Sequence, residues 1–156
     1  MGLTVGGAGV LEAQRRAHFG ARAGYDLDVD EFAMGAQVTV PVTRRLDFYP
    51  SVDRYFIDPG SLWSMNADVK VKPTPRADWL YLGGGLNVMR RSVGPTDDTD
   101  AGFNMLLGVE TQRGWIHPFA DGRLTLSDAN RFMVAAGLNI TLGRGSSAAK
   151  AAPTRR

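Results

Sequence analysis

Apolar and polar residues alternate with a period of two along most of this 156-residue chain, from Phe19 to Leu142. A β-strand produces such alternation, because successive side chains point to opposite faces of its sheet. No segment shows the period of an amphipathic helix. No apolar run approaches the roughly 18 residues of a membrane-spanning helix either, which excludes that class. The pattern therefore predicts an all-β protein.

The alternation falls into eight segments, separated by short stretches rich in residues that favour turns. Most segments have roughly 9–12 residues, the length of a tilted strand that crosses a bilayer. An even number of strands joined by short hairpins predicts an antiparallel up-and-down β-barrel. The longest connection, Arg91–Asp100, is predicted to be a mobile loop. The expected strands cover residues 19–27, 32–42, 46–53, 63–71, 80–88, 103–110, 116–126 and 132–142.

Alternation alone leaves open which face of the barrel is inside. A soluble, lipocalin-like carrier turns its apolar face inward, whereas a membrane barrel turns it outward to lipid. Glycine weakens a solvated strand, but in a narrow barrel it makes room for large neighbours. Most glycines of the segments fall on the polar face, which predicts a crowded polar interior and an apolar exterior. They are Gly20, Gly24, Gly35, Gly83, Gly85, Gly102, Gly108 and Gly137.

Aromatic residues gather near the ends of the expected strands, as they do at the two interfaces of a membrane barrel. The alternative is that they simply close the ends of the barrel. One group holds Tyr25, Phe32, Tyr55, Phe56, Trp63 and Phe132, and the other holds Phe19, Trp79 and Trp115.

The last segment, AAGLNITL (Ala135–Leu142), is similar to the C-terminal assembly signal of small outer-membrane barrels, with Gly137 before Ile140 and Leu142. It departs from that signal in having no final aromatic residue, in Ala135, and in the residues that follow it. The motifs YLGGGLN, GFNMLLGVE and PFADGRLTL also resemble strands of this group. The chain thus resembles the eight-stranded outer-membrane β-barrels of Gram-negative bacteria, the OmpA/OmpX-like superfamily.

This resemblance implies a bacterial outer-membrane location, a periplasmic N-terminus and a monomer. The implied partners are outer-membrane lipid, lipopolysaccharide and the barrel-assembly machinery. In this topology the inward turns carry Arg44, Arg45, Arg76 and Arg113. The outward loops are acidic and offer oxygen ligands to divalent cations, although solvated charges are the favoured interpretation. These loops carry Asp28, Asp30, Glu31, Asp58, Asp97, Asp98, Asp100 and Asp128.

The net charge of +2 does not describe a basic binding face. Four of the 18 Lys and Arg residues follow residue 143, which leaves 14 basic against 16 acidic groups before it. The absence of clustered basic and aromatic residues argues against nucleic-acid binding. We expect three parts: a disordered lead-in or signal remnant at 1–16, the barrel at 17–143, and a disordered basic tail at 144–156.

No residue pattern predicts catalysis, a metal site or a cofactor. The chain has no cysteine and two histidines, His18 and His117, and no Ser-His-acid arrangement is recognisable. Both histidines are expected to pack inside the barrel near its periplasmic end. The acidic run Asp97–Asp100 lacks the spaced glycine and closing glutamate of an EF-hand. No ligand-binding residue can be named.

Charged residues on the polar face predict an ionic network that plugs the lumen, in preference to an open channel. Its members are Arg22, Asp47, Asp68, Lys70, Glu110, Asp121 and Arg123. A turn at Gln112-Arg113 would set Asp121 opposite Asn104 and Arg123 opposite Gly102. Across the loop at 127–130, the expected partners are Gly137 for Asp121 and Ala135 for Arg123.

The expected function is therefore that of a non-enzymatic outer-membrane barrel, either a structural or surface-binding protein or a narrow small-solute channel. Two alternatives remain open from the sequence. One is the soluble carrier of an apolar ligand, and the other is a membrane-embedded lipid-modifying enzyme.

Overall fold

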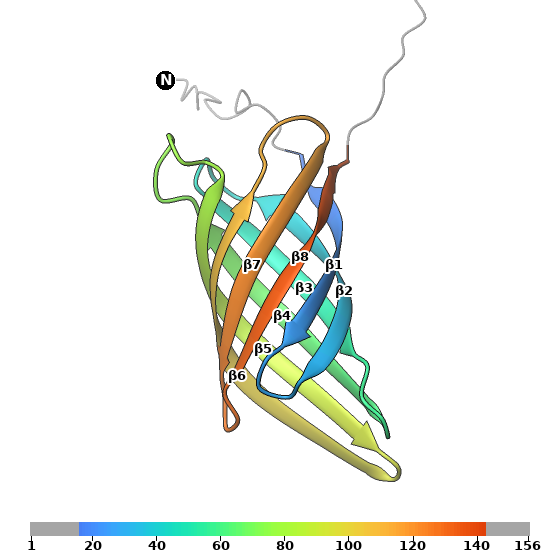
Figure 1. Cartoon of the computed structure of the whole chain (residues 1–156). Helices are drawn as coiled ribbons and strands as arrows, with labels where there is room; N and C mark the ends of the chain where they lie inside the picture. Colours follow the sequence, from blue (N-terminus) through green and yellow to red (C-terminus); the bar gives the residue numbers. More distant parts are fainter. Residues whose placement is uncertain (1–15, 143–156) are drawn as a thin grey trace, which may run out of the picture.

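Eight antiparallel strands follow one another around a closed barrel in the computed structural model, which describes residues 16–142 (Figure 1). Each strand pairs with the next, and β1 pairs with β8 to close the barrel. The predicted all-β antiparallel barrel is confirmed. No helix among these residues is long and apolar enough to cross a membrane. The strands are β1 (His18–Asp26), β2 (Glu31–Pro41), β3 (Leu46–Tyr55), β4 (Ser61–Val71), β5 (Leu80–Val93), β6 (Thr96–Glu110), β7 (Ile116–Leu126) and β8 (Arg131–Thr141).

Residues 1–15 and 143–156 lie outside the described residues; they hold nearly all of the predicted lead-in, the last residue of the predicted barrel and the whole predicted tail.

The barrel wall turns its apolar side chains outward and its polar side chains inward. Phe103 and Leu107 of β6, for example, are 65% and 56% exposed, whereas Asn104 beside them is 3% exposed. The predicted orientation of the two faces is confirmed, and the apolar-inward arrangement of a lipocalin-like carrier is wrong for this chain. The other outward-facing large side chains include Met34, Phe48, Met65, Leu82, Leu86, Met105, Val134 and Leu138.

Two glycines illustrate how the interior accommodates large side chains. A Cβ atom at Gly108 would overlap the ring and hydroxyl of Tyr81, and one at Gly137 would overlap the backbone oxygen of Ala21 and lie 2.7 Å from the ring of Phe119. No real Cβ atom tolerates such contacts, so any larger residue would displace an aromatic ring. The polar face carries glycines because it is the crowded face.

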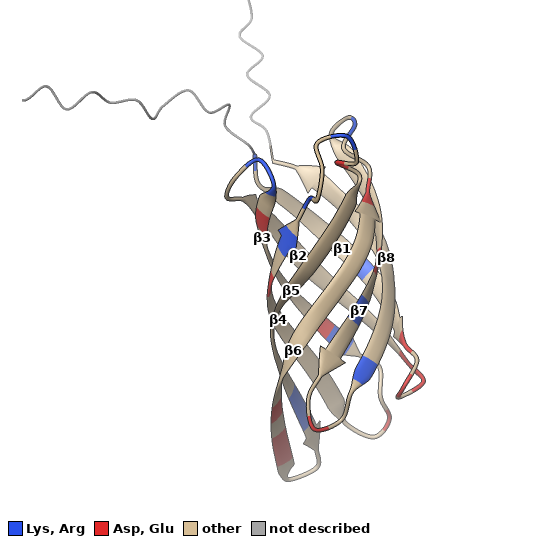
Figure 2. Ribbon diagram, turned by 90° about the vertical axis from the view of Figure 1, so that its left-hand side faces the viewer, with Lys and Arg blue, Asp and Glu red and all other residues tan. Residues whose placement is uncertain are grey.

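The two ends of the barrel differ in their connections (Figure 1). We call one the terminus end, because Leu142 there donates a backbone hydrogen bond to Ala17. It carries the β2–β3, β4–β5 and β6–β7 connections, and the hairpin end carries the other four. Figure 2 shows Lys and Arg in the connections of the terminus end and Asp in the hairpins of the other.

Of the aromatic residues predicted to form two belts, eight are exposed and one is not. Tyr55 is 4% exposed and lies inside the barrel, where its hydroxyl contacts the Met133 sulfur at 3.5 Å. Its place in an outer belt was a wrong prediction. The other eight, Tyr25, Phe32, Phe56, Trp63 and Phe132 with Phe19, Trp79 and Trp115, are each at least 39% exposed.

The predicted mobile loop Arg91–Asp100 is wrong, because β5 and β6 continue through it. Their pairing extends to Val93 and Thr96, and only Gly94 and Pro95 form the turn. Gly94 has a φ of 60°, a left-handed conformation that glycine adopts without steric cost. Because β7 pairs with β6 only from Phe103 onward, the end of this hairpin projects beyond its neighbours (Figure 1).

The predicted register around β7 is also wrong. Asp121 pairs with Gly108 of β6 and Ala135 of β8, and Arg123 pairs with Leu106 and Met133. The β6–β7 connection spans residues 111–115 and turns later in the chain than the predicted Gln112-Arg113 turn. The register is therefore four residues from the predicted one on the β6 side and two residues on the β8 side.

Candidate functional site

A buried cluster of ion pairs crosses the middle of the barrel. Arg22 of β1 lies 3.2 Å from Asp53 of β3 and 3.5 Å from Asp121 of β7. Arg123, two residues beyond Asp121, lies 3.3 Å from the other oxygen of Asp53 and 2.9 Å from Asp68 of β4. All five side chains are at most 3% exposed. We call these residues the ion-pair layer; it connects four strands across the lumen.

Hydrogen bonds complete the coordination of the carboxylates in this layer. Tyr81 donates to the second oxygen of Asp121 at 3.0 Å, and Asn104 donates to Asp68 at 2.8 Å. A buried charge is tolerated only when its remaining lone pairs and protons have partners. The carboxylates of the layer meet this requirement with side chains from facing strands, whereas the Nε atoms of Arg22 and Arg123 make no hydrogen bond.

Lys70 lies next to this layer, toward the terminus end, among aromatic rings. Its ammonium group is 3.5 Å from the centroid of the Tyr49 ring and 4.2 Å from that of Tyr81, with Phe119 at 5.7 Å. Glu110 supplies a carboxylate oxygen at 3.6 Å. Cation–π attraction strengthens when the cation has lost its water. The rings and Glu110 therefore hold a lysine that is only 1% exposed.

A chain of amide hydrogen bonds links Glu110 back to Arg22. Asn139 donates to Glu110 at 2.7 Å, and Gln37 donates to Asn139 at 2.6 Å. The Tyr49 hydroxyl donates to Gln37 at 2.5 Å and accepts from Arg22 at 3.3 Å. The lysine and the ion-pair layer thus belong to one connected polar network.

Near the hairpin end, apolar side chains pack together inside the barrel, beside the buried carboxylate of Asp26. The group has six members, and Ile57 packs against them. Each member is at most 7% exposed, so the group closes this end of the lumen. We call it the apolar cluster; its members are Ala33, Tyr55, Leu62, Met89, Met133 and Ala135.

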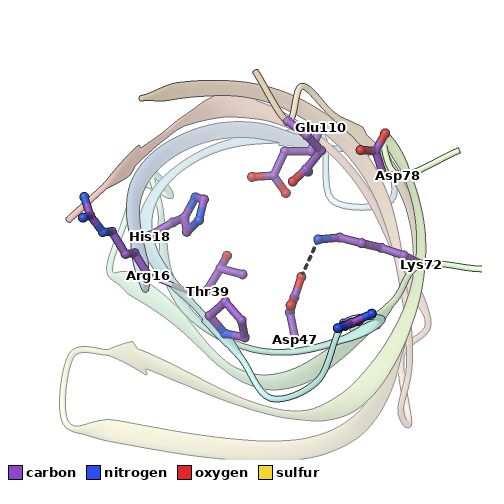
Figure 3. Close-up of a pocket in the computed structure, with 10 residues that line it drawn as sticks. Arg16, His18, Thr39, Asp47, Lys72, Asp78 and Glu110 are labelled. Carbon is purple, nitrogen blue, oxygen red and sulfur yellow. Dashed lines mark ion pairs between the residues drawn. The ribbon is translucent and has the colours of Figure 1, made fainter. Parts of the chain in front are cut away.

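The interior near the terminus end holds a cavity of about 350 Å³, which Figure 3 shows along the barrel. Asp47 and Lys72 form an ion pair of 3.1 Å at its wall, and Glu110 and His18 point into it. Thr39 Oγ1, Asp47 Oδ1 and His18 Nδ1 have no hydrogen-bond partner in the structure. The exposed lining residues at its mouth include Arg16 and Asp78.

His18 and His117 lie beside each other at this end, with ring centroids 4.6 Å apart. The Nδ1 atom of His117 is 2.7 Å from the backbone oxygen of Thr111, so it carries the proton. Its Nε2 atom is 2.9 Å from the Thr141 hydroxyl. The carbonyl of Thr111 thus fixes the tautomer and the orientation of the His117 ring.

The structure places all seven residues of the sequence-predicted network inside the barrel, each at most 6% exposed. It brings together Arg22 with Asp121, Arg123 with Asp68, and Lys70 with Glu110. Asp47 does not join them and pairs with Lys72 instead.

The sequence-predicted network omits Asp53, although this residue links both arginines. It also omits Tyr49 and Tyr81, which hold Lys70. All three lie on the polar side of the alternation, which was the available signal.

Comparison with solved structures gives the same architecture. The N-terminal β-barrel domain of Pseudomonas aeruginosa OprF is 15% identical with a TM-score of 0.65, covering 83% of this chain and 98% of that one. Neisserial surface protein A (NspA) is 17% identical with a TM-score of 0.60, covering 81% and 96%. The chain has the fold of the small eight-stranded outer-membrane barrels. No protein-family model and no curated protein sequence matches it.

Proposed function

We propose that this chain is an integral outer-membrane protein whose barrel is a closed, non-catalytic support for its hairpins. The observation that carries the proposal is the contrast between the two faces of the wall. The outside presents a continuous apolar surface, and the inside is filled by the ion-pair layer and the apolar cluster. An exposed apolar surface of this extent suits lipid and would cause aggregation in water.

The filled interior argues against steady solute transport. A solute entering the cavity at the terminus end meets Glu110 and Lys70, then the ion-pair layer, and then the apolar cluster. Passage requires all three to separate, and breaking buried ion pairs is costly. Under this proposal the hairpin end faces outward, the terminus end faces the periplasm, and the protein is a monomer placed by the barrel-assembly machinery.

The test is reconstitution of the chain into lipid vesicles. We expect the folded protein to migrate differently on a gel before and after boiling, and to give no steady single-channel conductance in a planar bilayer. Stable solubility in detergent-free buffer would overturn the membrane assignment. Steady conductance would overturn the closed interior while leaving the membrane assignment intact.

The absence of catalysis is tested separately by incubating the vesicles with labelled phospholipid and lipopolysaccharide. We expect no turnover above that of protein-free vesicles. If turnover occurs and is lost in His117→Ala, the lipid-modifying alternative replaces the proposal.

A further inference from the structure

Two cations stand on the outward face of the barrel wall, in contrast to the other cations of the strands. Of the seven Arg and Lys residues in the eight described strands, only Arg54 and Arg90 occupy outward-facing positions. Outward cations are costly within a lipid bilayer and are tolerated at its edge. Their position along the wall therefore indicates where the lipid-facing surface ends. The remaining five are Arg22, Lys70, Arg91, Arg123 and Arg131.

The two arginines flank one tryptophan on three adjacent strands. Arg54 of β3 pairs with Trp63 of β4, and Trp63 pairs with Arg90 of β5. The Arg54 guanidinium lies over the Trp63 ring, 5.6 Å from a ring centroid. Because neighbouring strands are about 4.8 Å apart, the two arginine backbones are separated by about 10 Å. Both side chains are long enough to meet above the indole between them.

This row marks the boundary of the apolar wall. The preceding cross-strand row, toward the terminus end, consists of Val52, Met65 and Val88 and is entirely apolar. On the other side, Ser61 pairs with Ser92 and Ser92 with Asp97. Trp63 is 41% exposed at the transition, the position that tryptophan prefers at a lipid–water interface.

We propose that Arg54, Trp63 and Arg90 form a binding site for the phosphate groups of an outer-leaflet glycolipid of the lipopolysaccharide type. The inference rests on the proposed function, which places the hairpin end at the outer leaflet. Guanidinium groups pair with phosphate oxygens through two parallel hydrogen bonds, and an indole packs against the adjoining lipid. The site lies at headgroup depth and supplies both kinds of contact.

Asp97 regulates the strength of this site. The carboxylate of Asp97 lies 2.7 Å from Arg90, and both side chains are more than half exposed. Exposed pairs of this kind contribute little to stability, so a phosphate can replace the carboxylate. Removing the charge at Asp97 therefore frees Arg90 and strengthens phosphate binding, opposite in sign to removing either arginine.

The experiment uses the full chain folded in detergent micelles, with Trp79→Phe and Trp115→Phe so that Trp63 is the one fluorescent tryptophan among the chain's three. Purified lipid A is titrated in, and the saturable change in Trp63 emission gives its Kd. Arg54→Gln and Arg90→Gln should each raise Kd about tenfold, since a hydrogen bond to a charged group contributes about that factor. Asp97→Asn should lower Kd severalfold.

Arg91→Gln is the matched control, because it removes the same charge from the next residue, which lies on the inward-facing row opposite Leu62. It should leave Kd unchanged. An equal effect of Arg91→Gln, or equal affinity for phosphatidylglycerol, would overturn the site in favour of general charge attraction. A chain that folds and changes gel mobility on boiling but does not bind lipid A refutes this inference alone; a chain that does not fold in micelles or vesicles refutes the proposed function.

Discussion

The two ends of the barrel interior differ in the side chains that occupy them. Near the hairpin end, the buried side chains of Tyr55, Leu62 and Met133 pack together, whereas near the terminus end a cavity of about 350 Å³ is lined by polar groups. Since the strands run through both ends, the difference arises from the inward-facing residues alone. The lumen therefore holds a polar cavity at the terminus end and is filled at the hairpin end, with the ion-pair layer between the two.

The strongest test of this asymmetry removes the layer that separates the two ends. Arg123→Ala removes a cation that contacts both Asp53 and Asp68. We expect a loss of about 3–5 kcal/mol in the free energy of unfolding, because uncompensated charges remain buried. Urea titration of the protein in vesicles measures it.

Arg113→Ala, in the exposed β6–β7 connection, is the control and should have little effect. The double variant Arg123→Ala with Asp68→Asn should lose less than the sum of the single variants, because the two side chains are in direct contact. Small additive losses would indicate hydrated charges and an open lumen.

The closed end is tested with Leu62→Ala. Leu62 is 3% exposed within the apolar cluster, and truncating a buried leucine costs about 2–5 kcal/mol. Thr39→Ala at the cavity wall, where the hydroxyl has no partner, should cost far less. If both variants lose the same free energy of unfolding, the two ends are equally well packed and the comparison fails.

The outer wall should not share the asymmetry of the lumen. Leu107→Arg and Val38→Arg place a cation on the outward apolar face, where a site near the bilayer midplane costs about 2–4 kcal/mol. Folding titrations in bilayers measure this cost. Values below about 1 kcal/mol for both variants would argue against contact with lipid.

The smallest expected effect concerns how fast a reagent reaches the two ends of the lumen. The chain has no cysteine, so single cysteines report local access without background. His18→Cys, at the cavity, should react with a small charged thiol reagent at least about tenfold faster than Ser64→Cys, which is 3% exposed beside Asn87. Both should react equally in urea, and equal rates in the folded state would indicate a lumen open at both ends.

The sequence predicts which face each strand residue occupies because alternation is a local property. Asp121 and Arg123 lie inside, as their places in the alternation require, and so do the glycines that pack against Tyr81 and Phe119. The alternation also predicts that Tyr55 lies inside, since it is on the same face of the strand as Tyr49 and Asp53. The outer-belt prediction followed its aromatic ring instead.

The sequence does not predict which inward charges meet. The β6–β7 turn lies later in the chain than expected, and this shift in register gave Asp121 and Arg123 different partners from those predicted. Contacts across the lumen are harder still to predict from the sequence, because β1 and β3 are not neighbours in the sheet and no local pattern links Arg22 to Asp53. The length of the β5–β6 hairpin was misjudged because its polar composition resembles that of a loop.

The position of Arg22 on the first strand has a consequence for the order of folding. Its partner Asp121 is 99 residues away in the chain, and β1 itself must pair with β8 before the barrel closes. Hairpins between consecutive strands form from near neighbours, whereas contacts over such separations are slow because the loop must close first. We therefore expect the charges of the ion-pair layer to keep their water until the final seam forms, so that closure and dehydration occur in the same late step.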